Sequence, residues 1–135
     1  MDFSSMLKPG LRAQTSQIVT DKLVASAWGS GGLAVFATPA MIALMEMTSL
    51  SAVDPLLPAG WSTVGTELNV KHLAATPAGM KVQCEAELLE VSGRRLLFKV
   101  DAFDEAGKIG EGTHSRFIVE NERFVQKINE KIQKH

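Results

Sequence analysis

Apolar and polar residues alternate over long stretches in the second half of the chain. From residue 80 to 88, and again from 96 to 102, every second side chain is apolar, and a similar alternation runs through 62–72. A period of two is typical of strands that bury one face. In the 62–72 stretch, this pattern places on one face Val64, Thr66, Leu68, Val70 and His72.

Turn sequences separate the alternating stretches. They are "ATPAG" at 75–79, "SGRR" at 92–95 and "DEAG" at 104–107, and their residue types favour tight turns. Strands joined by short hairpins are antiparallel neighbours. A last strand is expected over about 108–120, and the Thr-, Val- and Ile-rich segment 11–28 predicts one or two further strands.

A long apolar helix is expected between these two groups of strands. Thr38 followed by Pro39 is a helix-start signal, with threonine as the N-cap and proline as the first helical residue. Leucine, methionine and alanine then continue to about Val53. The sequence "DPLLPAG" at 54–60 ends the helix.

A second helix is expected at the C-terminal end, with Asn121 as its cap. Its apolar stripe consists of Phe124, Val125, Ile128 and Ile132. A sheet of hairpin-joined strands has one face to bury, and the long helix is the large apolar body that can cover it. We therefore expect an α+β fold in which an antiparallel sheet wraps around the helix, with residues 1–135 forming a single domain.

The composition of the chain indicates which binding partners and which cellular location to expect. The formal net charge is -1, which indicates neither nucleic acid nor an anionic membrane as a partner. The longest apolar run falls short of the roughly 20 residues that a membrane-spanning helix needs. The single cysteine, Cys84, is expected to be a buried thiol, and the N-terminal residues do not resemble a signal peptide. A cytoplasmic protein is expected.

Glu46 is the first candidate for chemistry, because it interrupts the apolar helix with no basic residue nearby in the sequence. A lone ionised carboxylate among apolar neighbours is costly unless it is paired or hydrated. One interpretation is that the helix tilts and Glu46 meets water at the surface. The other is that Glu46 lies in a partly dry pocket, where it acts as a base or a nucleophile.

His72 and Thr38 are the next candidates. His72 is the last residue on the inward face of its strand. It is either a core histidine whose two nitrogens both have partners, or an acid/base group whose pKa lies near neutral pH. Thr38 needs no role beyond capping, although a helix N-terminus also suits a developing oxyanion. Gly65 is either a bulge or a point where a ligand approaches the backbone. His114 and Arg116 share a face of the last strand, and we interpret them as a solvated or interface pair.

Metal and cofactor motifs are missing from the sequence. There is no CxxC, no HExxH and no glycine-rich phosphate loop, and the histidine spacing supports no metal site. Neither a metal nor an organic cofactor is expected.

Three segments together resemble a known family. They are "ATPAMIALME", "GTELNVKHLAATPAG" and "EVSGRRLLFKVDAFDEAGKIGEGTHSRFIV". They are similar to the hotdog-fold acyl-coenzyme A thioesterases, and most of all to the fluoroacetyl-coenzyme A thioesterases. The resemblance covers roughly residues 10–130.

The resemblance implies hydrolysis of an acyl-coenzyme A thioester, with coenzyme A as part of the substrate. It implies homodimers joined edge to edge, with the active site at the interface, and it leaves open whether dimers pair into tetramers. The implied catalytic residues are Thr38, Glu46 and His72. Gly65 and Arg116 match substrate-binding positions, and we add Phe36, just before the helix, to that group.

The chain departs from the fluoroacetyl-coenzyme A thioesterases at three places. Pro39 stands where a glycine is expected, Met47 replaces an aromatic residue, and "GSGGLAVF" at 29–36 does not resemble the lid that selects fluoroacetyl groups. The expected substrate is therefore an acyl-coenzyme A thioester whose acyl group the sequence does not specify.

The spacing of Thr38 and Glu46 raises a geometric question. If both are helical, they lie roughly 12 Å apart along the axis and cannot bond within one chain. Either the helix begins later and the preceding loop folds back, or the two side chains meet across a dimer. Two other functions stay open: a hydratase or dehydratase of acyl thioesters with the same fold, and a non-catalytic acyl-binding module.

Overall fold

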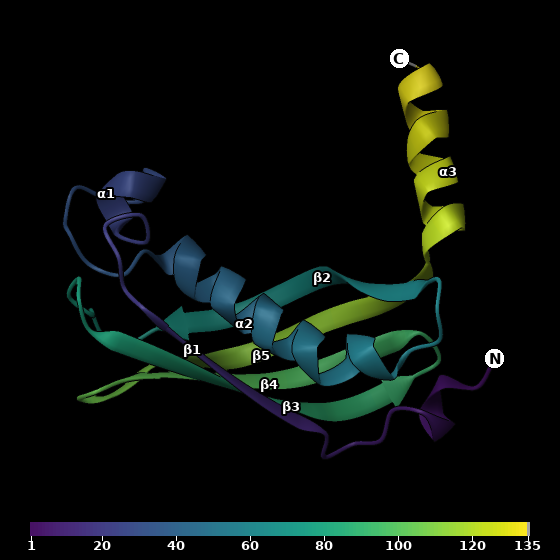
Figure 1. The fold of residues 1–135 in the computed structure, drawn as a ribbon, viewed down its shortest axis with the longest axis horizontal. Coiled ribbons are helices and arrows are strands. Elements are labelled where there is room, and N and C mark those ends of the chain that lie inside the picture. Colours follow the sequence, from purple (N-terminus) through teal and green to yellow (C-terminus); the bar gives the residue numbers. More distant parts are fainter. Residues whose placement is uncertain (135) are drawn as a thin grey trace.

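A five-stranded antiparallel sheet curves around one long helix (Figure 1) in the computed structural model, which describes residues 1–134. The sheet order is β1-β3-β4-β5-β2, and every neighbouring pair is antiparallel. The strands are β1 (Arg12–Ile18), β2 (Trp61–His72), β3 (Lys81–Ser92), β4 (Arg95–Asp104) and β5 (Gly107–Glu120).

The helix α2 (Thr38–Val53) fills the concave side of the sheet, as predicted. Its side chains Met41, Leu44 and Met45 belong to the same buried cluster as Leu88 of β3 and Phe98 of β4. Burying a side chain of this size contributes roughly 1.5–3 kcal/mol. The predicted alternation of β3 and β4 is confirmed, because its apolar side chains form the floor on which α2 packs.

Cys84 lies in this floor and is fully buried, which confirms its prediction as a core thiol. Burial raises the pKa of the Cys84 thiol to about 11. The reactive thiolate form is therefore scarce at neutral pH.

Strand β2 departs from the predicted alternation. Its register with β5 shifts between Gly65 and Glu67, so Thr66 is an extra residue that forms a β-bulge. A bulge moves the following side chains to the opposite face of the expected pattern. Thr63 is buried on the helix side, whereas Val64 lies on the outer face. The predicted common face for Val64 and Thr66 with Leu68, Val70 and His72 is therefore wrong.

The segment 11–28 contains one strand and one short helix, not two strands. After β1 the chain forms α1 (Ala25–Trp28), which ends at Gly29 in the left-handed conformation. Left-handed backbone at a helix end favours glycine. Two further 3-10 turns are Phe3–Ser5 and Asp54–Leu56.

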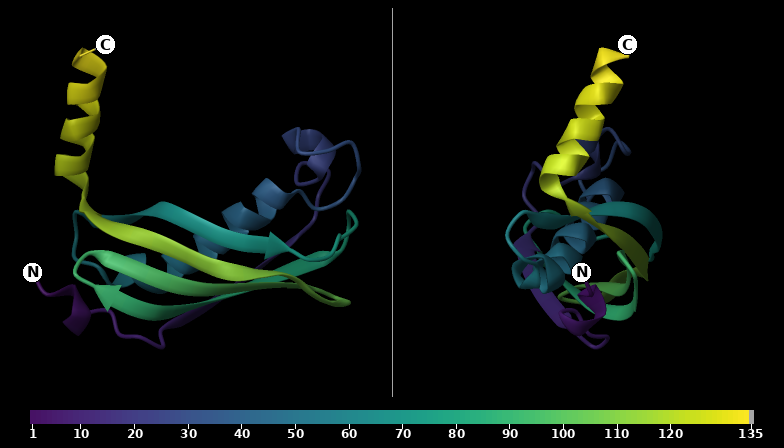
Figure 2. Two further views of the ribbon diagram at one scale, coloured as in Figure 1. Left: turned by 180° about the vertical axis from the view of Figure 1, so that it is seen from behind. Right: turned by 90° about the vertical axis from the view of Figure 1, so that its right-hand side faces the viewer.

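The predicted C-terminal helix is confirmed as α3 (Asn121–Gln133), but its cap is not. Glu120 occupies the cap position without a side-chain hydrogen bond, and the Asn121 side chain instead accepts a hydrogen bond from Ser62. Figure 2 shows α3 standing away from the sheet at the end opposite α1. Its apolar stripe, Phe124, Val125, Ile128 and Ile132, is exposed.

No helix within residues 1–134 is long and apolar enough to cross a membrane.

Candidate active site

Thr38 and His72 meet where α2 begins and β2 ends. Thr38 Oγ1 lies 2.7 Å from His72 Nδ1, a hydrogen bond between residues 34 positions apart. The cap position of α2 is Ala37, with no side-chain cap, so the predicted capping role of Thr38 is wrong. The hydroxyl is hydrogen-bonded to the imidazole instead.

The second nitrogen of His72 lacks a partner of normal geometry. Nε2 is buried and receives no hydrogen bond from residues 1–134. Burial lowers the pKa of His72, and the backbone of Ala74 opposes this shift in part. The imidazole is therefore neutral at pH 7. A core histidine with both nitrogens satisfied does not describe this residue, and Nε2 can exchange a proton with an incoming group.

An open, mainly apolar hollow of about 410 Å³ lies next to this pair. Phe36 forms part of its wall, and its ring stands edge-on to His72 with 6.5 Å between the ring centroids. The glycine-containing residues 30–33 form another wall. The hollow has the apolar walls and few polar groups that are usual in small-molecule sites.

Glu46 lies in a second cluster, half-way along α2. Its Oε2 is 3.8 Å from Arg116 Nη1, and 40% of its side chain is exposed. A Cβ atom added to Gly65 would stand 2.7 Å from the same oxygen. A side chain at this position would displace the carboxylate, which rests on the β2 backbone. Glu46 therefore reaches water, as the first interpretation expects, and it is also paired with Arg116; its role as a base or a nucleophile stays a prediction.

Arg116 is buried, with only 4% of the residue exposed. It donates from Nε to Thr63 Oγ1 at 2.8 Å and from Nη2 to the Thr63 carbonyl at 2.9 Å. The Thr63 hydroxyl in turn donates to Asp54 at 2.6 Å. Burial lowers the pKa of Arg116, and the charges of Asp54 and Glu46 oppose that shift. The guanidinium is therefore fixed and charged beside the carboxylate.

His114 completes the second cluster and is also buried, so the solvated alternative predicted for His114 and Arg116 is wrong, whereas the interface alternative stays a prediction. The alternation of β5 carries the signal that we missed, because it places both residues on the same face as the core residue Ile118. Thr63 and Asp54 were missed as well. The bulge that turns Thr63 inward has no distinct sequence pattern.

The two clusters stay apart within one chain. Helix α2 includes Thr38 and continues past Glu46, so the loop does not fold back and the two residues lie about 12 Å apart along the axis. Between Gly65 and His72, β2 advances by about 20 Å. The Thr38–His72 pair and the Glu46–Arg116 pair therefore face different parts of the same sheet edge.

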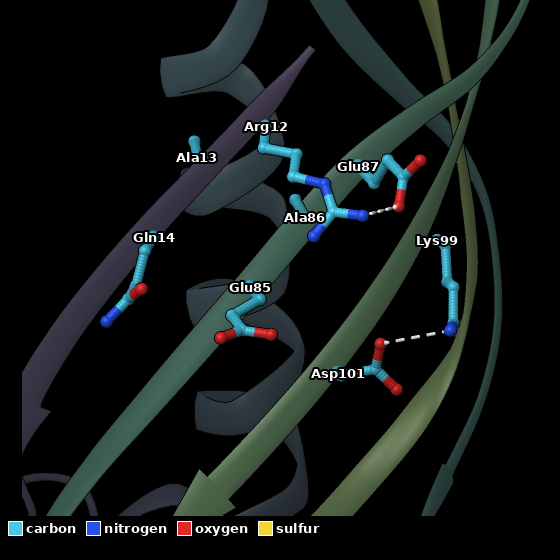
Figure 3. Close-up of a pocket in the computed structure, with 8 residues that line it drawn as sticks. All are labelled: Arg12, Ala13, Gln14, Glu85, Ala86, Glu87, Lys99 and Asp101. Atoms are coloured by element: carbon cyan, nitrogen blue, oxygen red, sulfur yellow. Dashed lines mark ion pairs between the residues drawn. The ribbon is translucent and has the colours of Figure 1, made fainter. Parts of the chain in front are cut away.

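Another hollow, of about 320 Å³, lies over the outer face of β1, β3 and β4 (Figure 3). Its side chains carry both signs of charge, with Arg12 paired to Glu87 at 3.0 Å and Lys99 to Asp101 at 3.7 Å. In both pairs the cation is exposed and the carboxylate is partly buried, and ion pairs at a surface contribute little to stability. Within residues 1–134, no three His, Cys, Asp or Glu side chains are grouped so that they could hold a metal ion.

Comparison with known proteins identifies relatives of the chain. A family model described as fluoroacetyl-CoA-specific thioesterase matches residues 19–122, which include all six candidate residues. The fluoroacetyl-CoA thioesterase of Streptantibioticus cattleyicolor is 44% identical over 97 residues, which cover 72% of this chain and 70% of that protein.

Solved structures agree with this match. The fluoroacetyl-CoA thioesterase superposes with a TM-score of 0.88 at 35% identity, covering 93% of this chain and 97% of that one. Variants of that enzyme have been solved with fluoroacetate and with acetyl-CoA. A hot-dog-like protein from Thermanaerovibrio acidaminovorans has a TM-score of 0.89 at 22% identity, with 97% of both chains covered. The expected hotdog fold is confirmed.

Proposed function

Because the chain belongs to the fluoroacetyl-CoA-specific thioesterase family, we propose that it hydrolyses an acyl-CoA thioester to the free acid and coenzyme A. The observation that carries this proposal is the hydrogen-bonded Thr38–His72 pair, whose imidazole keeps one buried nitrogen free beside an apolar hollow. The charge-paired Glu46 supplies the carboxylate that such a reaction needs.

The site becomes complete when two copies pair along β2. This strand is at the edge of the sheet, and within residues 1–134 no strand pairs with its outer side. Antiparallel pairing about a two-fold axis at Asn69, with Thr66 left out of the pairing as the bulged residue, sets Gly65 of one copy opposite His72 of the other. Both residues face the helix side of the sheet, so this register brings Glu46 to the Thr38–His72 pair of the partner.

The chemistry follows from these groups. The thioester carbonyl lies near the start of α2 and the Gly65 backbone, whose N–H groups stabilise the oxyanion. Glu46 either removes a proton from water as it attacks the carbonyl carbon, or attacks that carbon itself to give an anhydride that water cleaves. The carbon–sulfur bond breaks, and His72 shuttles the proton, which ends on the departing thiolate. Thr38 orients His72.

The proposed substrate is an acyl-CoA thioester in general, not fluoroacetyl-CoA in particular. The hollow beside His72 is bounded by the glycine-containing 30–33 segment, and Pro39 and Met47 differ from the family pattern described above. We also retain a cytoplasmic location and a homodimer as proposals. The buried Cys84 supports the first, and the unpaired edge of β2 supports the second.

A thiol-release assay over a panel of acyl-CoA thioesters tests the function. Wild-type protein is expected to release coenzyme A from at least one of them. Glu46→Gln is expected to lose at least about a hundredfold in rate, the usual scale for a positioned acid or base. His72→Ala and Thr38→Ala are expected to lower kcat as well.

The same panel separates the other functions. Reversible addition of water to an enoyl-CoA without thiol release would identify a hydratase or dehydratase. Binding of acyl-CoA with no reaction, unchanged by Glu46→Gln, would identify a non-catalytic module. Either result contradicts the proposed hydrolysis.

A further inference from the structure

His114 is a buried, titratable residue to which the proposed reaction gives no task. It is 1% exposed, and its ring stacks on Phe98 with 6.3 Å between the centroids and 29° between the planes. Its Nδ1 lies 2.9 Å from the Glu67 carbonyl oxygen, at the bulge of β2. Its Nε2 lies 3.2 Å from Arg116 Nη1.

These two contacts fix where the hydrogen of the ring resides. A backbone carbonyl only accepts, so Nδ1 must carry the hydrogen that bonds Glu67. A guanidinium only donates, so Nε2 must present its lone pair to Arg116. The neutral ring with hydrogen on Nδ1 satisfies both contacts. The doubly protonated ring would set an N–H against an N–H of a like-charged partner.

We propose that His114 is a positioning residue that holds Arg116 toward Glu46, as a neutral ring with its hydrogen on Nδ1. This inference rests on the proposed hydrolysis for its kinetic consequences. Thr63 fixes Nε and Nη2 of Arg116, whereas His114 fixes Nη1. Nη1 is also the nitrogen that faces Glu46. Because Thr63 already holds the plane of the rigid guanidinium, His114 adds an acceptor for a buried N–H of Nη1. Without that acceptor the N–H is left unpaired beside Glu46, and the guanidinium must shift to satisfy it.

The charged groups that face His114 are Arg116 on its own strand and Glu46 on α2. Burial and the Arg116 charge lower the pKa of His114, whereas the Glu67 carbonyl and Glu46 raise it in part. The ring therefore stays neutral at pH 7, where Arg116 needs its lone pair. On acidification below the lowered pKa, protonation removes the acceptor and turns the ring into a second cation beside Arg116.

Nitrogen-15 NMR of the full-length protein tests the tautomer directly and requires no turnover. We expect the His114 signals to show hydrogen on Nδ1 and to stay unchanged as the pH falls from 8 through about 6.5, the ordinary histidine pKa. Hydrogen on Nε2, or a titration midpoint at the ordinary value, would overturn the proposal. This result stands whether or not the protein proves to be a thioesterase.

Two variants of His114 test the consequence for Arg116. His114→Gln keeps an uncharged acceptor for Nη1, whereas His114→Leu keeps bulk without one. We expect the Leu variant to lose about ten- to a hundredfold in kcat, the scale of a misplaced reacting group, with KM changed by less than about threefold. We expect kcat of the Gln variant to lie within about threefold of wild type. We also expect its kcat to fall less than that of wild type as the pH is lowered, because glutamine does not titrate.

Ser115→Ala, a neighbour whose side chain lies on the opposite face of β5, is the matched control and should behave as wild type. Equal losses in the Gln and Leu variants, with thermal midpoints near that of wild type, would contradict positioning through Arg116. If His114→Leu does not fold, the kinetics of His114→Gln and the NMR assignment of the His114 tautomer still test the proposal. If no thioester is hydrolysed, the Arg116 Nη1–H resonances decide, since they should match wild type in the Gln variant and shift in the Leu variant; equal shifts in both would contradict the proposal.

Discussion

At Gly65 the absence of a side chain lets the Glu46 carboxylate rest on the backbone of β2. An added Cβ would come within 2.7 Å of Glu46 Oε2 and 3.2 Å of His114 Cε1. We expect Gly65→Ala to displace the carboxylate and to lower kcat at least about tenfold, with a stability cost of about 1–3 kcal/mol from overpacking. Steady-state kinetics and urea unfolding measure the two effects.

A double variant provides the control for Gly65. In a Glu46→Gln background the carboxylate has already been removed, so adding Gly65→Ala should cost little further rate. Multiplicative losses in the double variant would show that Gly65 acts independently of Glu46.

The two histidines within residues 1–134 give the stability a defined dependence on pH. Burial lowers the pKa of both His72 and His114 in the folded state. At pH values between the lowered and the ordinary pKa, about 6.5, the unfolded chain therefore binds more protons than the folded one. We expect the free energy of unfolding to be fully retained above about pH 6.5 and to fall as the pH decreases through this window.

Urea unfolding at a series of pH values measures this dependence. His114→Gln should flatten the fall, because the glutamine side chain does not titrate. A wild-type free energy of unfolding that rises as the pH falls through the same window would contradict this prediction.

At the scale of elements, the regularly alternating parts of the strands could be predicted and the bulges could not. The alternation of β3 and β4 follows from one buried face, and the length of α2 follows from its apolar run between Pro39 and Asp54. The hydrophobic pattern is enough to predict these elements because the burial of apolar side chains is the main free energy that stabilises them.

The errors share a different physical origin. Thr38 and Asn121 suit helix caps, yet their side chains bond to His72 and Ser62, partners that only the tertiary fold brings near. The bulge at Thr66 changes which face the start of β2 presents, without altering residue type. Five of the candidate residues line the two clusters at the sheet edge, but the sequence could not show that they form two separate groups.

Thr66 is the extra residue of β2, and removing it tests the role of the bulge. Without it, either Thr63 and Gly65 or Leu68 and His72 must turn outward. We expect a chain lacking Thr66 to be inactive and to melt well below wild type. Thr66→Ala, which keeps the length and loses one 3.2 Å hydrogen bond to the Ser115 carbonyl, should change stability by only about 1 kcal/mol. Equal melting of both variants would contradict this account.

At the scale of the whole molecule, the separation of the two clusters makes a prediction about mixed assemblies. If each site takes Glu46 from one copy and His72 from the other, a dimer of a Glu46→Gln chain and a His72→Ala chain contains one intact site. Co-expressed chains that pair at random form half of their dimers this way, so about a quarter of wild-type activity should return. No recovery in purified mixed dimers would place each site within one chain.

The distance between Thr38 and Glu46 along α2 also sets how activity scales with the amount of protein. If each site takes its carboxylate from one copy and its imidazole from the other, as proposed, a solitary chain is inert until it encounters a second chain. Below the dissociation constant of the pair, the rate should therefore rise with the square of the protein concentration. Dilution alone then switches the enzyme off, with no inhibitor and no unfolding.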